Sequence, residues 1–187
     1  MAQYIALLRG INVGGKNIVK MADLKRMFEE LGLQPVQTYI QSGNVLFRSD
    51  KEEEALRKTI EQEFARIFGF PVIVVLRTVT QLEEIIRDCP FSKEAIAEAE
   101  RASAAESLYV ALLLQAPAAV SVERLHTYRS KNDEFYITGR DVYLLFHHSI
   151  RDSKLANNLS KLAVPMTVRN WKTVTKLMQL AAAAKDK

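Results

Sequence analysis

The chain has 187 residues, with 26 Lys+Arg against 22 Asp+Glu and a formal net charge of +4. Hydrophobic residues make up 48% and charged residues 26%, which is typical of a folded globular protein and excludes disorder over most of the length. A single cysteine, Cys89, excludes an intramolecular disulfide. The N-terminus lacks the features of a signal peptide, and no apolar run reaches the roughly 20 residues of a membrane span. We therefore expect a cytoplasmic protein that does not enter a membrane.

Hydrophobic periodicity predicts a strand, a helix, two hairpin strands, a helix and a strand in the first half of the chain. Their ranges are 3–9, 21–31, 36–40, 45–48, 51–68 and 72–76. A bridging helix over 81–87 and an Ala- and Glu-rich linker over 91–106 follow. We predict that residues 1–90 form the first subdomain.

The second half, residues 107–187, repeats this order. A strand over 108–114, a helix over 121–128 capped by Ser121, hairpin strands at 134–138 and 142–146, and a helix over 152–162 precede an extended stretch around Pro165. An added C-terminal helix over 168–184, capped by Thr167, is expected to end the chain. The halves predict an α+β fold of duplicated βαββαβ units, two ferredoxin-like subdomains with antiparallel sheets in strand order 4-1-3-2. Chance alternation of elements is the alternative to duplication.

The loop after the first strand, residues 9–17 (RGINVGGKN), is the most informative segment. Its three glycines permit positive φ and bring backbone N–H groups close to an anion. The loop misses the nucleotide-binding P-loop by one residue, because Asn17 stands where Ser or Thr would hold Mg²⁺. An anion-binding loop and a structural turn both remain open.

The strand order predicts that this loop lies beside the turn over residues 41–44 (QSGN). The shared edge would carry several hydrogen-bond donors and no acid, which suits a phosphate, a carboxylate or a nucleic-acid backbone. The predicted ligand-binding residues are Arg9, Gly10, Asn12, Gly14, Gly15, Lys16, Gln41, Ser42 and Asn44. Asn12, Ser42 and Asn44 could equally serve only as loop and turn caps.

The positive charge is concentrated in residues 151–187, which hold 8 Lys+Arg against 2 Asp+Glu. Nucleic-acid binding by this segment is the second hypothesis. Arg169, Lys172 and Lys176 are expected on the outer face of the C-terminal helix, and Lys154 is a further candidate anion ligand. An ordinary solvated helix face is the alternative.

No pattern indicates a metal site, a cofactor or a nucleophile. His147 and His148 are adjacent on a predicted strand and so point to opposite faces. His126 stands alone, and Cys89 beside Pro90 is more typical of packing than of nucleophilic chemistry.

Four segments together carry a family resemblance: residues 9–15 (RGINVGG), 20–21 (KM), 38–45 (TYIQSGNV) and 167–174 (TVRNWKTV). They resemble Domain of Unknown Function 1697, a family of uncharacterised bacterial proteins, over nearly the whole chain. The resemblance implies a duplicated fold of two ferredoxin-like halves and brings no activity or catalytic residues. It also marks Asn170 and Trp171, with Arg169, as secondary candidates.

The leading hypothesis is therefore a protein that binds a small anionic ligand at residues 10–17 and 41–44. Catalysis, if present, would be transfer or hydrolysis of a phosphoryl- or carboxylate-bearing substrate by positioning and charge stabilisation. A non-enzymatic interaction module is the third hypothesis, and a homo-oligomer is compatible with each.

Overall fold

The computed structural model describes residues 1–184, which form two compact units. Unit 1 comprises residues 1–84 and the described residues from 175 onward, and unit 2 comprises residues 85–174. Each unit is built on one four-stranded antiparallel sheet. The α+β fold of two ferredoxin-like halves is confirmed.

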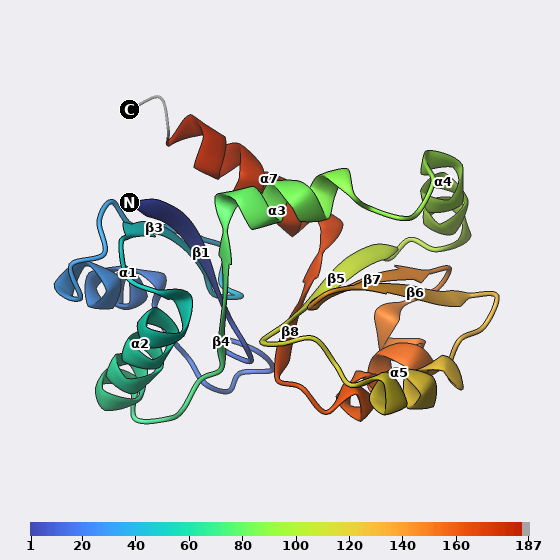
Figure 1. The fold of residues 1–187 in the computed structure, drawn as a ribbon, viewed down its shortest axis with the longest axis horizontal. Helices are drawn as coiled ribbons and strands as arrows, with labels where there is room; N and C mark the ends of the chain where they lie inside the picture. Colours follow the sequence, from blue (N-terminus) through green and yellow to red (C-terminus); the bar gives the residue numbers. More distant parts are fainter. Residues whose placement is uncertain (185–187) are drawn as a thin grey trace. The chain divides into compact units, whose positions relative to one another are not determined.

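Unit 1 contains a sheet in the order β2-β3-β1-β4 (Figure 1). Its strands and the two helices between them are β1 (Ala2–Leu8), α1 (Met21–Glu30), β2 (Gln37–Tyr39), β3 (Asn44–Ser49), α2 (Glu53–Phe68) and β4 (Val74–Thr78). Helices α1 and α2 cover one face of this sheet (Figure 1). Tyr4, Ala6 and Leu8 point into the core under these helices, while Ile5 and Leu7 are buried on the opposite face. Successive side chains of a strand point to opposite faces. Because both faces of β1 are buried, the strand is apolar on both.

Unit 2 contains a sheet in the order β6-β7-β5-β8. Its strands are β5 (Leu108–Leu113), β6 (Asp133–Thr138), β7 (Asp141–Phe146) and β8 (Met166–Asn170). Its helices include α4 (Lys93–Ala102), α5 (Ala119–His126) and the single turn α6 (Lys154–Asn157), which lies between the 3₁₀ turns η1 (Ile150–Asp152) and η2 (Leu159–Leu162). The predicted linker 91–106 thus contains helix α4, which Ser92 caps by accepting a hydrogen bond from the Ala95 N–H.

The strands of the two sheets pair in the same register, residue for equivalent residue. Leu7 pairs with Asn44 in β3 and Ile5 with Arg77 in β4, while Leu112 pairs with Asp141 and Val110 with Arg169. Equal registers at equal places in both halves favour a true duplication over chance alternation.

The fourth strand of each half runs directly into a helix. After β4, helix α3 (Val79–Arg87) begins with a reciprocal cap between Thr78 and Gln81. After β8, helix α7 (Trp171–Ala183) begins where the Asn170 side chain accepts from the Thr173 N–H. Helix α7 is therefore the counterpart of α3 in the repeat, and the duplicated unit is βαββαβα.

Three predicted helices differ from the structure. For the helix over 168–184, the predicted start with Thr167 as its cap is wrong. Residues 166–170 instead form the last strand of the second sheet and pair with β5. The helix over 152–162 is broken into short turns that end at Ala163, which has a φ of 55°. The helix predicted at 121 begins at Ala119, so Ser121 does not cap it.

A buried carboxylate, Asp133, organises the start of β6. Its oxygens lie 2.9 Å from His148 Nε2 and 3.0 Å from the donating Ser130 Oγ. Burial alone would raise the pKa of Asp133, but hydrogen bonds from Ser153, His148 and Ser130 outweigh it and lower the pKa below 3.8. These bonds stabilise the ionised carboxylate in the folded chain.

We expect Asp133→Asn to lower the free energy of unfolding by about 1–2 kcal/mol at pH 7. Because the folded-state pKa is depressed, this contribution is present above pH 3.8 and is lost as the pH falls through the folded-state pKa. Urea unfolding of both chains at several pH values checks this. The difference in the free energy of unfolding between the two chains should narrow as the pH falls below 3.8. A difference that widens there would contradict this role of Asp133.

Candidate functional site

Residues 10–17 form a small hairpin, hereafter the glycine hairpin. The Asn12 N–H donates to the Asn17 carbonyl at 3.0 Å, and the Lys16 N–H donates to the Val13 carbonyl at 3.0 Å. Gly14 and Gly15 between them have φ of 58° and 73°. Two consecutive positive φ values are what a two-residue type I′ turn needs, and paired glycines supply them without strain.

Asn12 connects the glycine hairpin to the rest of unit 1. Its Oδ1 accepts from the Val19 N–H at 2.8 Å, and its Nδ2 donates to the Val19 carbonyl at 2.9 Å. The same Nδ2 donates to the Gln41 carbonyl at 2.9 Å. Asn12 thus holds both ends of the loop and joins it to the turn between β2 and β3.

That turn spans residues 40–43 and packs directly against the loop. The Leu8 N–H donates to the Gly43 carbonyl at 2.8 Å. Gly43 has a φ of 81°, and a Cβ built on it would lie 2.6 Å from Ile11 Cδ1 and 3.0 Å from Leu8 Cβ. Only glycine fits here. The predicted meeting of the two segments at one edge is therefore present, and we call residues 9–20 together with residues 40–44 the rim.

The side chain of buried Asn44 stabilises the turn over residues 40–43. Its Nδ2 donates to the Tyr39 carbonyl at 2.9 Å and to Ser42 Oγ at 3.0 Å. Asn12 and Asn44 thus serve the local backbone, as the alternative reading of these residues expected. Gly10 also belongs to this framework, since its carbonyl accepts from Asn17 Nδ2 at 3.1 Å.

The cations of the rim face solvent. Arg9, Lys16 and Lys20 are exposed, and within residues 1–184 none of them forms an ion pair. Residues 1–22 and 31–49 contain no Asp or Glu. The N–H groups of Gly14 and Gly15 donate to no acceptor in the described chain. Lys20 is not among the ligand-binding residues predicted from the sequence. The absence of Asp and Glu from residues 1–22 is the sequence feature that could have indicated it.

The glycine hairpin is not a P-loop. Helix α1 begins at Met21, beyond Asn17, and Lys20 precedes it without a side-chain cap. Lys16 closes a hairpin turn instead of opening a helix. The partial positive charge of a helix N-terminus therefore does not act inside the hairpin, because it falls off within the first turn.

The rim also exposes apolar side chains. The exposed fractions are 64% for Val13, 65% for Ile18 and 46% for Ile40. Ile40 has a φ of 47°, an unusual conformation for a β-branched residue. Val13 and Ile18 lie on the same segment as Arg9, Lys16 and Lys20, and Ile40 lies in the adjoining turn.

The C-terminal candidates differ in exposure and in their partners. The prediction that Arg169 is exposed is wrong. Its side chain is buried and donates to Thr167 Oγ1 and the Val168 carbonyl. Burial lowers the pKa of Arg169 to about 10. Lys172 is exposed but lies 2.7 Å from Glu106. Asn170 caps α7, half-buried Trp171 is the first residue of that helix, and Lys154 is exposed at the start of α6.

Over residues 1–184 no group of three His, Cys, Asp or Glu side chains is placed to hold a metal ion. In the same range, no helix has the length and apolar character needed to span a bilayer.

The fold defines a class of protein, the duplicated ferredoxin-like α+β proteins, here with a braced glycine hairpin at one sheet edge. A family model described as protein of unknown function (DUF1697) matches residues 1–143. The chain belongs to this family.

One solved structure that the chain resembles is the conserved bacterial protein SP0830 from Streptococcus pneumoniae. The two are 26% identical, with a TM-score of 0.70, over 95% of this chain and 97% of that one. A search of curated proteins gave no match.

Proposed function

We propose that the rim binds a small anionic ligand carrying a phosphate or a carboxylate. The observation that carries this proposal is the charge at the rim. Arg9, Lys16 and Lys20 are exposed and without an acidic partner within residues 1–184. A cationic side chain is usually stabilised by a neighbouring acidic side chain. Three cations without such a partner on one short loop therefore favour the binding of an anion from solution.

The rim residues divide into two groups in this proposal. Arg9 and Lys16 flank Gly10 and Asn17, which are bonded to each other at the base of the glycine hairpin. Arg9 and Lys16 supply charge. The N–H groups of Gly14 and Gly15, which have no acceptor within residues 1–184, and the exposed side chain of Gln41 supply directional hydrogen bonds. Asn12, Asn44 and Gly43 hold the backbone and do not touch the ligand.

A thermal-shift screen tests the proposal, using nucleotides, sugar phosphates, acyl-CoA and carboxylates at low and physiological salt. A ligand at ten times its Kd adds about 1.4 kcal/mol of stability. For a chain of this size that raises Tm by about 3–6 °C. Polynucleotide belongs in the screen as well, and a shift that only polynucleotide gives, and only at low salt, would favour nucleic-acid binding.

For a ligand found in this way, we expect Arg9→Gln combined with Lys16→Gln to weaken binding at least tenfold, because the charge-assisted hydrogen bonds are lost. Lys161→Gln is the matched control, since Lys161 is an exposed lysine of unit 2 without an ion pair in the described chain. Isothermal titration calorimetry measures the affinities. Equal weakening by the control, or none by the double variant, would contradict the proposal.

A second candidate function is a protein-interaction module, favoured by the exposed Val13, Ile18 and Ile40. Exposed apolar groups beside cations are common at protein interfaces. A homo-oligomer held through the rim would lose mass in light scattering when Val13 and Ile18 are both replaced by Ser. Unchanged mass together with unchanged anion binding would contradict a homo-oligomer held through the rim. Anion binding would then be the one function proposed for the rim.

A further inference from the structure

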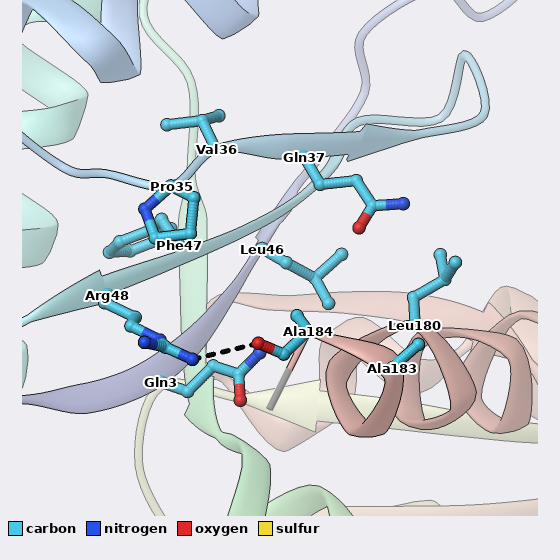
Figure 2. Close-up of a pocket in the computed structure, with 10 residues that line it drawn as sticks. All are labelled: Gln3, Pro35, Val36, Gln37, Leu46, Phe47, Arg48, Leu180, Ala183 and Ala184. Atoms are coloured by element: carbon cyan, nitrogen blue, oxygen red, sulfur yellow. Dashed lines mark hydrogen bonds between the residues drawn. The ribbon is translucent and has the colours of Figure 1, made fainter. Parts of the chain in front are cut away.

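A groove of about 620 Å³ lies in unit 1, away from the rim residues. It is formed by the start of β2, by β3 and by residues 180–184 at the end of α7, all of which belong to unit 1 (Figure 2). Leu46, Leu180 and Ala183 give it an apolar lining. The volume falls in the range of roughly 300–1,000 Å³ of small-molecule sites.

The strand register brings polar side chains into this groove. Gln3 pairs with Arg48 across β1 and β3, and Leu46, on the same face as Arg48, pairs with Gln37 of β2. Gln3, Arg48 and Gln37 therefore share one face of the sheet with Leu46. All four line the groove in Figure 2.

Arg48 has unused bonding capacity. It is half-buried, and its Nη2 donates to the Ala184 carbonyl at 3.0 Å at the end of α7 (Figure 2). A guanidinium has five N–H donors, and no further side-chain hydrogen bond or ion pair of Arg48 occurs within residues 1–184. A cation beside an apolar lining favours a carboxylate, which it can bind through two parallel hydrogen bonds.

Gln3 provides a second, independent observation. Its Nε2 donates to the Ala181 carbonyl at 3.3 Å, which fixes the orientation of the amide. Its Oε1 is buried and has no hydrogen-bond partner in the described chain. A buried acceptor without a partner is unfavourable, and a ligand N–H or O–H would satisfy it.

We propose that this groove is a second binding site, for an amphipathic carboxylate with an N–H or O–H donor near the acid, as in an N-acyl amino acid. Arg48 binds the carboxylate, Gln3 Oε1 accepts from the donor, and the acyl chain packs against Leu46, Leu180 and Ala183. No contact of this site involves the rim, so the two proposals stand or fall separately.

Calorimetric titration with N-octanoylglycine, and with its uncharged amide N-octanoylglycinamide, tests the proposal. The acid should bind at least tenfold more tightly than the amide. Arg48→Gln should weaken binding of the acid at least tenfold and bring it to the level of the amide. Arg124→Gln, at an exposed arginine of α5, and the double variant Arg9→Gln with Lys16→Gln should leave the affinity unchanged.

Equal affinities of acid and amide for the unmodified chain would overturn the proposal, and so would the absence of any binding. This comparison needs no substitution, so it holds even where Arg48→Gln loosens the end of α7. Octanoate, which lacks the N–H donor, should bind less tightly than N-octanoylglycine. Equal binding would overturn the role of Gln3.

Discussion

Gly43→Ala should be the most destabilising single methyl addition at the rim. The new Cβ would lie 2.6 Å from Ile11 Cδ1 and 3.0 Å from Leu8 Cβ, on a backbone held at a φ of 81°. The left-handed conformation costs about 1–2 kcal/mol for a residue with a Cβ, and overpacking adds about 1–3 kcal/mol. We expect a loss of about 2–5 kcal/mol in the free energy of unfolding, measured by urea denaturation.

Gly139→Ala is the matched control for this substitution. Gly139 lies in the hairpin between β6 and β7 with a φ of 59°, and nothing lies within 4 Å of its added Cβ. Only the backbone cost of about 1–2 kcal/mol applies there. Equal losses for the two variants would mean that the turn over residues 40–43 does not pack against Ile11, and the rim as described would be wrong.

Asn12→Ala should have the second-largest effect, because it removes every side-chain bond that holds the glycine hairpin to Val19 and Gln41. Four hydrogen bonds, one of them to Gln41 Oε1 at 3.4 Å, are worth about 0.5–1 kcal/mol each at this partly exposed site. Together with a φ of 54° that suits Asn better than Ala, they predict a loss of about 2–5 kcal/mol. Urea denaturation measures it.

Asn12→Gly separates the two contributions. Glycine accepts the positive φ but makes no side-chain bond, so its loss in stability should be smaller than that of Asn12→Ala by about 1 kcal/mol. Both variants should also weaken ligand binding at the rim, since the hairpin is no longer held beside the turn. Full affinity in both would contradict the framework role of Asn12.

The sequence predicts the sheets well and the ends of some helices poorly. Alternating apolar residues in β1 and the paired strands around residues 40–43 define the first sheet, since register follows from which face is buried. In contrast, Val168, Trp171 and Val174 have a helical spacing by coincidence. Residues 166–170 are a strand because β5 needs a neighbour on that edge, which no local pattern reveals.

The candidate site could be predicted in outline only. The strand order brings the glycine hairpin beside the turn, and the glycines mark the positive-φ positions. The roles of Asn12 and Asn44 could not be read in the same way, because an amide that caps a loop and one that binds a ligand look alike in sequence. The groove was missed because it depends on where the end of α7 lies against Gln3 and Arg48.

The central claim, that the rim binds an anion, is tested most directly by a two-dimensional amide NMR titration with pyrophosphate at physiological salt. The amides of Gly14, Gly15 and Lys16 should shift in a saturable way, and the double variant Arg9→Gln with Lys16→Gln should abolish the shifts. Unmoved Gly14 and Gly15 amides up to about 10 mM pyrophosphate, far above any useful affinity, would contradict the claim.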